Sequence, residues 1–276
     1  EPLISSKTSR ILSGITTENE DENLEILDTQ GAPCLTQPST IVRGTMRSYQ
    51  LKGLEWLLHM FDNGLSPILG DEMGLGKTLQ TISFLAALKE LNIGGPHLVV
   101  VPLSVMSSWL GEFRKWCPTL RVVRIHTTDR AERERIRKEV LGDIRNYDVA
   151  LTTYEYLLVP EMRHALYSRV TWRCVVLDEG HKVKNESSLV SQAVRKLKAE
   201  CVVLLTGTPL QNNLTELWAV LNFLYPRVFD EKAKVKFANA FELSTSTVRF
   251  VHVYNFQNHH TLVLTHTQTY NTADTD

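Results

Sequence analysis

The sequence lacks the features of a membrane protein, a zinc protein or a disulfide-rich secreted domain. Its apolar runs are far shorter than a membrane span, and its first residues do not form a signal peptide. The cysteines include no Cys-x-x-Cys pair and no His/Cys cluster; they are Cys34, Cys117, Cys174 and Cys201. Their scatter argues against both a zinc site and a disulfide framework, and it fits a reducing compartment.

A strong charge of either sign is also absent. Lysine plus arginine number 30 and aspartate plus glutamate 31, so the formal net charge is −1. No global basic field therefore indicates nucleic acid, and any DNA binding must come from a local patch. The most basic run is also balanced, because its charges pair at helical i,i+4 spacing: Arg130 with Glu134, Glu134 with Lys138, and Arg135 with Glu139.

The chain has 276 residues, enough for one large globular domain. It does not begin with Met, which suggests a fragment. Composition predicts an acidic, largely disordered lead-in over residues 1–40 and one domain over 41–230. Residues 231–276 are predicted to be an irregular tail, disordered or not a natural continuation. Within it, 247–256 and 261–267 alternate as strands do, but nothing earlier in the chain requires them.

Apolar runs alternate with helical patterns along the middle of the chain. Strands are predicted at 97–102, 121–126, 149–153, 173–178 and 202–206. Helices are predicted at 47–62, 79–91, 105–116, 130–141, 155–166, 187–197 and 214–224. Such alternation predicts an α/β fold with a doubly wound parallel sheet, helices on both faces and right-handed crossovers.

Residues 66–79 have the pattern of a phosphate-binding loop between a strand and a helix. Gly74 and Gly76 let backbone N–H groups turn toward an anion, and Lys77 is placed to reach the β- and γ-phosphates of a nucleotide. Thr78 would ligate Mg²⁺. The strict motif has glycine where this chain has Asp71. The residues predicted to bind ATP are Gln50, Asp71, Glu72, Met73, Gly74, Leu75, Gly76, Lys77 and Thr78.

Gln50 joins this set because a glutamine amide donates and accepts on one edge, as the recognition of adenine demands. It lies at the start of a predicted helix shortly before the loop. Taken alone, it would be read as a polar residue at a helix N-terminus. Its position upstream of a phosphate loop favours a role in binding adenine.

An acidic pair follows the strand at 173–178. Asp178 is predicted to hold Mg²⁺, and Glu179 to orient or deprotonate the attacking water. The predicted catalytic residues are therefore Lys77, Asp178 and Glu179, and the metal ligands are Thr78 and Asp178. His181 either couples the acidic pair to the next strand or is simply packed. The hydroxyls of Thr206 and Thr208 are predicted to sense the γ-phosphate.

These motifs together resemble helicase superfamily two, and within it the switch/sucrose-nonfermenting ATPases. The resemblance covers roughly residues 40–230 and rests on the following runs: Tyr49-Gln50, Asp71–Thr78, Val101-Pro102 with Trp109, Thr152–Glu155, Asp178–His181 with Lys184-Asn185, and Leu205–Asn213 with Glu216–Trp218. Asp71 belongs to this family's own form of the phosphate loop. Gly180 replaces the commoner alanine of the Asp-Glu-Ala-His box, a small change that leaves the acidic pair intact.

The resemblance implies a RecA-like first lobe of a nuclear DNA-dependent ATPase that slides or remodels nucleosomes, with ATP and Mg²⁺ as cofactors. It implies duplex DNA and nucleosomes as partners, and no membrane. It also implies that four residues face the DNA backbone: Pro102, Ser104, Thr153 and Tyr154. The acidic lead-in is similar to that of imitation-switch remodellers, while the lymphoid-specific-helicase and chromodomain-helicase types stay open.

Two other functions stay open at this stage. One is a repair or transcription-coupled DNA translocase of the same superfamily. The other is a non-hydrolysing module that binds nucleotide or DNA. The family implies a second RecA-like lobe that supplies arginine fingers, and no further α/β repeat follows Phe229. Because an arginine finger contributes on the order of 10³ to 10⁵ in rate, the chain is expected to bind nucleotide and hydrolyse it poorly.

Overall fold

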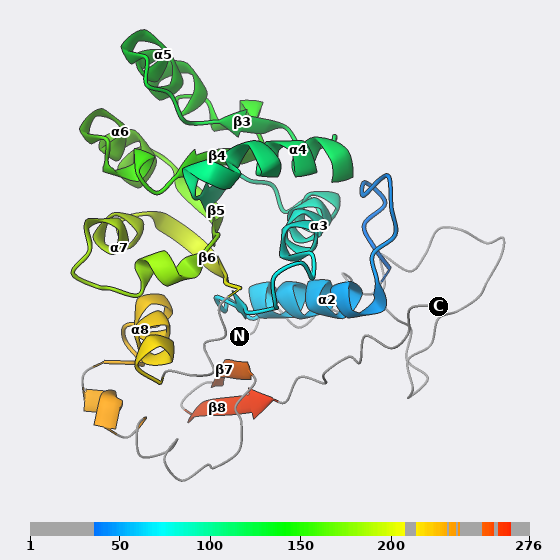
Figure 1. Cartoon of the computed structure of the whole chain (residues 1–276), viewed down its shortest axis with the longest axis vertical. Helices are drawn as coiled ribbons and strands as arrows, with labels where there is room; N and C mark the ends of the chain where they lie inside the picture. The colour runs from blue at the N-terminus through cyan, green and yellow to red at the C-terminus, as the bar shows by residue number, and fades with distance from the viewer. Residues whose placement is uncertain are drawn as a thin grey trace, which may run out of the picture.

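The fold is built on a six-stranded parallel sheet with the strand order β1-β6-β5-β2-β4-β3 (Figure 1). The computed structural model describes residues 36–207, 214–230, 232–235, 237, 250–256 and 259–265. The strands of the sheet are β1 Ile68–Leu69, β2 His97–Val101, β3 Val122–Arg124, β4 Val149–Thr153, β5 Thr171–Leu177 and β6 Lys198–Leu205. The predicted parallel α/β sheet is therefore confirmed. No helix of the described residues is both long and apolar enough to cross a membrane.

The helices connect successive strands, as in a doubly wound sheet. They are α2 Ser48–Asp62, α3 Lys77–Glu90, α4 Met106–Trp116, α5 Arg130–Arg135, α6 Pro160–His164, α7 Leu189–Val194 and α8 Leu214–Leu224. Short turns extend several of them, including η1 Leu103–Val105, η2 Ile136–Val140, η4 Tyr156–Leu158, η5 Ala165–Arg169 and η6 Gly180–Val183. The helix predicted over 155–166 is thus interrupted at Val159, between η4 and α6, because Pro160 has no backbone N–H with which to continue a helix from η4.

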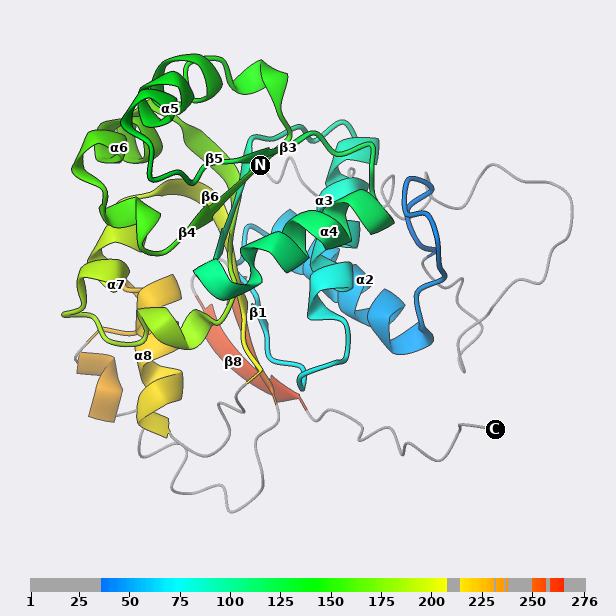
Figure 2. The same ribbon diagram turned by 45° about the horizontal axis from the view of Figure 1, so that its top comes forward.

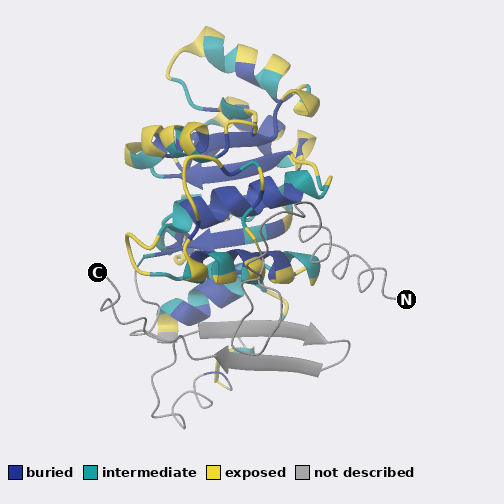
Figure 3. Cartoon of the chain, turned by 90° about the vertical axis from the view of Figure 1, so that its right-hand side faces the viewer, coloured by how far each residue is buried: buried dark blue, intermediate teal, exposed yellow. Residues whose placement is uncertain are grey.

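Alternate residues of each strand supply two separate cores. In β2, Val99 and Val101 face α2, α3 and α4, whereas Leu98 and Val100 face the opposite side. Figure 2 shows α2, α3 and α4 on one side of the sheet and α5 to α8 on the other. The central strands are dark blue in Figure 3, because they are buried on both faces. The continuous apolar runs of the sequence are what such strands require.

The basic run on α5 and η2 is neutralised locally, as its spacing predicts. Lys138 pairs with Glu134 at 2.8 Å and Arg135 with Glu139 at 3.5 Å. Arg137 also reaches Glu134, at 2.6 Å, and takes the place predicted for Arg130. This surface is a network of exposed ion pairs, and such pairs add little to stability.

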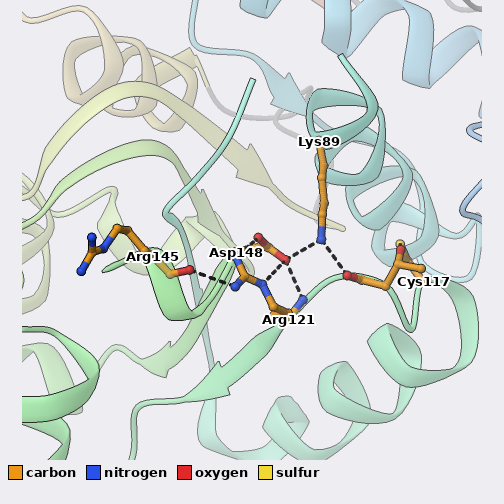
Figure 4. A network of polar contacts seen from close by, with 6 residues as sticks. Lys89, Cys117, Arg121, Arg145 and Asp148 are labelled. Atoms are coloured by element: carbon orange, nitrogen blue, oxygen red, sulfur yellow. Dashed lines mark hydrogen bonds and ion pairs between the residues drawn. The ribbon is translucent and has the colours of Figure 1, made fainter. Parts of the chain in front are cut away.

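Asp148 organises the amino-terminal edge of the sheet (Figure 4). Its carboxylate accepts hydrogen bonds from Lys89 Nζ at 2.7 Å and from Arg121 Nη2 at 2.8 Å. Burial alone would raise the pKa of Asp148, but the bonds from Arg121 and Lys89 outweigh it and lower the pKa to about 2. The network ties the end of α3 to the start of β4, at the edge where the amino ends of the strands lie.

His97 begins β2 beside this network. Its side chain is buried, and its Nδ1 has no hydrogen-bond partner among the described residues. Burial and the nearby Arg173 guanidinium lower its pKa to about 4, and Asp148 opposes them only in part. The imidazole is therefore neutral at pH 7.

The packed region extends past both predicted boundaries. Residues 1–35 of the predicted lead-in lie outside the described residues, but Ser39 and Thr40 are held by Glu90 at the end of α3. Its Oε1 accepts from Ser39 Oγ at 3.0 Å, Thr40 N at 2.8 Å and Thr40 Oγ1 at 2.7 Å. At the other end, Phe237 packs on Trp218 of α8, with the ring centroids 5.2 Å apart.

The predicted irregular tail contains a pair of strands. β7 Phe250–Phe256 and β8 His259–Thr265 form an antiparallel ladder in which Phe250 lies opposite Thr265 and Phe256 opposite His259. The alternation of the sequence marks these strands, although no earlier repeat predicts them. The structure therefore shows regular strands at residues 250–256 and 259–265, within the stretch that the sequence predicts to be irregular.

Candidate nucleotide site

The phosphate loop lies between β1 and α3, at the carboxyl edge of the sheet. Gly74 and Gly76 have φ of +89° and +83°, values that L side chains rarely adopt. At Gly76 the space is also closed, since a Cβ would lie 2.4 Å from Gln50 Nε2. The two glycines that define the sequence motif are therefore required by the backbone path.

Lys77 starts α3, and its ammonium group lies on the rim of the loop. Nζ donates to the backbone carbonyls of Asp71 at 2.6 Å and Glu72 at 2.9 Å. Burial lowers the pKa of Lys77, and the carboxylates of Asp71, Asp178 and Glu179 partly oppose this effect. The structure thus brings Lys77 into the field of the acidic pair, as the sequence predicts.

The remaining loop residues differ in exposure. Met73 is 78% exposed and Leu75 38%, and Glu72 and Gly74 are also on the surface. Thr78 is half-buried in the first turn of α3. The Asp71 side chain accepts from Gln80 Nε2 at 3.0 Å, so it braces the loop against α3.

Gln50 is buried against the loop, and its amide is engaged within the protein. Its Nε2 donates to the Leu75 carbonyl at 3.2 Å, and its Oε1 accepts from the Arg47 N–H at 3.0 Å. The structure therefore places Gln50 at the predicted site, as a support for the phosphate loop. Reading an adenine edge would require these two bonds to open.

Asp178 follows β5 and faces Lys77 across the edge. Its Oδ2 accepts from Trp109 Nε1 at 2.8 Å, and its Oδ1 accepts from the Glu179 N–H at 3.0 Å. Burial raises the pKa of Asp178, and the Trp109 hydrogen bond lowers it in part. Glu179 has φ 53° and ψ 54°, a left-handed conformation that turns its side chain away from the strand path.

The end of β6 closes the site. Thr206 is buried, and its N–H donates to the Leu69 carbonyl at 3.1 Å, so β6 is joined to β1 next to the loop. A Cβ on Gly207 would lie 2.7 Å from Met73 Cγ and 3.7 Å from Lys77 Nζ. Thr208, the other predicted γ-phosphate sensor, lies outside the described residues.

His181 lies in η6, just after the acidic pair, and its Nδ1 has no hydrogen-bond partner among the described residues. Its Nδ1 is 3.2 Å from Glu179 Oε2, but the angle is unsuitable for a hydrogen bond, and this nitrogen is buried. The proximity fits the prediction that His181 couples the acidic pair to its surroundings. That role remains a prediction.

Two of the four residues expected to face DNA do not lie on the surface. Pro102 is half-buried and Ser104 exposed, both at η1 after β2. Thr153 and Tyr154 are fully buried. The Thr153 hydroxyl lies 3.2 Å from His126 Nδ1, and Tyr154 donates to the Asp178 carbonyl at 2.6 Å. The expectation of direct DNA contact by these two is corrected, because their polar atoms point into the protein.

Trp109 is a site residue to which the sequence analysis gave no role. It belongs to the motif runs, but its bond to Asp178 joins positions 69 residues apart. No local pattern predicts which buried indole meets which carboxylate. The only sequence signal is that Trp109 lies in the first turn of the helix after β2, on the same edge as Asp178.

The donor set fits Mg²⁺ bound together with a nucleotide. The described residues include no group of three or more His, Cys, Asp or Glu that would hold a metal alone. Thr78 and Asp178 provide two oxygen donors, and Mg²⁺ characteristically takes its other ligands from water and phosphates. The ammonium of Lys77, at the rim of the loop and close to Gly207, supplies a positive charge suited to a phosphate.

Gly180 is not the small change that the sequence suggests. A Cβ at this position would lie 2.2 Å from Leu204 Cδ2 and 2.3 Å from Leu204 Cγ. Gly180→Ala is therefore expected to lower the free energy of unfolding by about 1–3 kcal/mol, as overpacking does. Urea denaturation monitored by tryptophan fluorescence measures this change.

Gly111→Ala is the matched control for Gly180→Ala. A Cβ at Gly111 would meet no described atom within 4 Å beyond its own helix backbone and chain neighbours, and Gly111 is exposed in α4. Its replacement by alanine is expected to leave stability unchanged or to raise it, because alanine favours the helix. Adding Leu204→Ala to Gly180→Ala is expected to destabilise less than the sum of the single changes. Additive effects would show that the two side chains do not clash.

Comparisons with known proteins agree with this geometry. The family model described as SNF2-related domain matches residues 49–271. An ISWI chromatin-remodeling complex ATPase of Arabidopsis thaliana is 46% identical over 80% of this chain and 21% of its own length. Transcription regulatory protein SNF2 of Saccharomyces cerevisiae is 47% identical over 74% of this chain and 12% of its own. The chain spans about a fifth of the former relative and less of the latter.

A solved structure is similar as well. The Sulfolobus solfataricus SWI2/SNF2 ATPase core in complex with dsDNA matches with a TM-score of 0.65 and 36% identity. The match covers 77% of this chain and 42% of that one. The identities to the two eukaryotic relatives differ by one percentage point, 46% against 47%, so they do not favour the imitation-switch branch.

Proposed function

Because this chain belongs to the SNF2-related family, we propose that it is the ATP-binding lobe of a nuclear, DNA-dependent ATPase that remodels or slides nucleosomes. One observation carries the proposal: Lys77, Asp178 and Gly207 converge on the phosphate loop at the carboxyl edge of a parallel sheet. Ligands of open α/β sheets bind at this edge. The relatives whose names include chromatin remodelling support the cellular role, and the neighbour solved with duplex DNA supports the partner.

The residues divide the chemistry among them. Lys77 exchanges its two carbonyl partners for the β- and γ-phosphate oxygens, which offer full negative charge in place of a dipole. The N–H groups of the loop and of the first turn of α3 bind the same phosphates. Thr78 and Asp178 would hold Mg²⁺, whose charge offsets that developing on the phosphates.

Glu179 completes the reaction. Its carboxylate orients a water against the γ-phosphorus and takes its proton as the new oxygen–phosphorus bond forms. The bond between the γ-phosphorus and the bridging oxygen breaks, and ADP and phosphate leave. The left-handed backbone at Glu179 separates its side chain from that of Asp178, so the two neighbouring carboxylates serve different roles.

We also propose the limits of the domains and the DNA surface. The ATP-binding lobe corresponds to residues 41–230, with packed extensions at both ends, at Ser39 and Thr40 and at Phe237. DNA backbone contacts come from η1, where Pro102 and Ser104 lie, and from the N-terminus of α4. Translocation along DNA belongs to the whole protein, of whose relatives this chain matches a fraction.

Titration of the 276-residue chain with a fluorescent ATP analogue, with and without Mg²⁺, tests the proposal. We expect saturable binding that weakens when EDTA removes the metal. Duplex DNA is expected to bind regardless of sequence, with log affinity falling by about 0.9 per log unit of salt for each phosphate contacted. A nucleotide affinity that is the same with and without Mg²⁺, or the absence of nucleotide binding, would refute the proposal. A DNA affinity that depends on the DNA sequence and does not change with salt concentration would refute the proposed DNA surface.

A further inference from the structure

Two aromatic side chains hold Asp178 from separate elements. Trp109 in α4 donates its indole N–H to Oδ2 at 2.8 Å, and Tyr154 after β4 donates its hydroxyl to the backbone carbonyl at 2.6 Å. Both side chains are buried, so water does not compete for these bonds. The position of the proposed metal ligand therefore depends on two segments that lie outside its own strand.

Trp109 is joined directly to the exposed edge of the domain. η1 follows β2 and runs straight into α4, whose first turn contains Trp109. Leu103 in η1 is 54% exposed, whereas the Trp109 ring is buried beside Phe113, with the centroids 5.9 Å apart. A ligand that moves η1 must also move the first turn of α4, and with it the indole that holds Asp178.

Tyr154 has a comparable position at the end of β4. The next residue, Glu155, is exposed and lies 3.6 Å from the Lys182 ammonium in η6. Lys182 also lies over the Tyr154 ring, 5.3 Å from its centroid. The charges of Glu155 and Lys182 are thus connected to the Asp178 carbonyl through Tyr154, which Lys182 contacts and which donates to that carbonyl.

We propose that Trp109 and Tyr154 are positioning residues that link the binding of a DNA backbone at this edge to the binding of Mg²⁺ and nucleotide at Asp178. The inference rests on the proposed function of the site. DNA phosphates at η1 and at the N-terminus of α4 shift the indole relative to Oδ2. By thermodynamic reciprocity, the factor by which DNA changes nucleotide affinity equals the factor by which nucleotide changes DNA affinity.

Trp109→Phe and Tyr154→Phe each remove one donor and keep the ring. The measurement is the Kd of a fluorescent Mg·ATP analogue in the full chain, with and without saturating duplex DNA. In the parent chain we expect DNA to change the Kd about 10-fold, within the usual range of coupling between sites. Each variant is expected to reduce this ratio to below about 3, and the double variant to bring it near 1.

Matched controls exist for both changes. Trp116 in α4 also donates its indole N–H to a carboxylate, that of Glu112. Tyr167 also donates its hydroxyl to a backbone carbonyl, that of Leu157. Trp116→Phe and Tyr167→Phe remove the same types of bond away from Asp178 and are expected to keep the parent ratio.

The ratio separates positioning from general stability, because a purely structural defect weakens nucleotide binding with and without DNA alike. If both variants retain the parent ratio, or if DNA leaves the Kd of the parent unchanged, the inference is overturned and the proposed nucleotide site survives. Failure of the parent to bind Mg·ATP overturns the proposed function instead. If Trp109→Phe does not fold, the ratio measured for Tyr154→Phe alone decides whether the inference stands.

Discussion

Lys77→Ala is expected to weaken the binding of Mg·ATP by about 100-fold. The ammonium would contact both the β- and γ-phosphates, and hydrogen bonds to charged groups are typically worth about 1.5–3 kcal/mol each. Two such bonds account for at least two orders of magnitude in Kd. In the free protein the ammonium binds two backbone carbonyls, so its loss leaves those carbonyls at a solvated rim and should alter stability little.

Equilibrium titration with a fluorescent ATP analogue measures this change, and Lys138→Ala is the matched control. Lys138 also carries one positive charge, but it is exposed on η2, where it pairs with Glu134. Its removal tests whether net charge alone affects the affinity. Equal weakening by both variants would mean that the loop does not bind the phosphates through Lys77. Unchanged melting of Lys77→Ala would exclude unfolding as the cause.

Acidification is expected to cost the folded chain about 3 kcal/mol through His97. Its pKa is about 4 in the fold and about 6.5 in an unfolded chain, so the unfolded state binds the proton more readily. The stabilisation is fully present above pH 6.5 and is lost as the pH falls through 4. Asp148, with a pKa of about 2, adds a second loss between about pH 4 and pH 2.

Denaturation at several pH values tests this expectation. His97→Leu removes the titrating group and should flatten the dependence between pH 6.5 and 4, leaving the further fall below pH 4 in place. Because His97 Nδ1 has no partner among the described residues, leucine breaks no bond of that atom. His164→Leu, at an exposed position in α6, should retain the parent slope. If His97→Leu also retains the slope, His97 does not titrate as described.

The sequence predicted those parts of the fold that depend on local pattern. The run at 97–102 reads as a strand buried on both faces, and His97–Val101 is one. Gly74, Gly76 and Lys77 predict a phosphate loop because each has a local backbone or charge requirement. Thr153 and Tyr154 show the limit of the family resemblance, which implied that both face DNA, whereas the neighbouring elements bury both side chains.

Long-range contacts account for most of what the sequence did not reveal. Trp109 meets Asp178 across 69 residues, and Gly180 faces Leu204 from the adjacent strand. Neither pairing has a periodic signal, because each depends on the order of strands in the sheet. The engagement of Gln50 by Leu75 and Arg47 is similar, since residue type predicts hydrogen-bonding capacity and the fold decides which partner uses it.

The left-handed backbone at Glu179 means that the residue best for stability differs from the residue that the proposed reaction needs. A side chain in this conformation is strained by about 1–2 kcal/mol, and glycine would relieve that strain. Selection for the most stable fold alone would therefore favour glycine at position 179. The proposed role of Glu179 in hydrolysis requires a carboxylate at this position, and the strain is the stability that the fold gives up to keep it there.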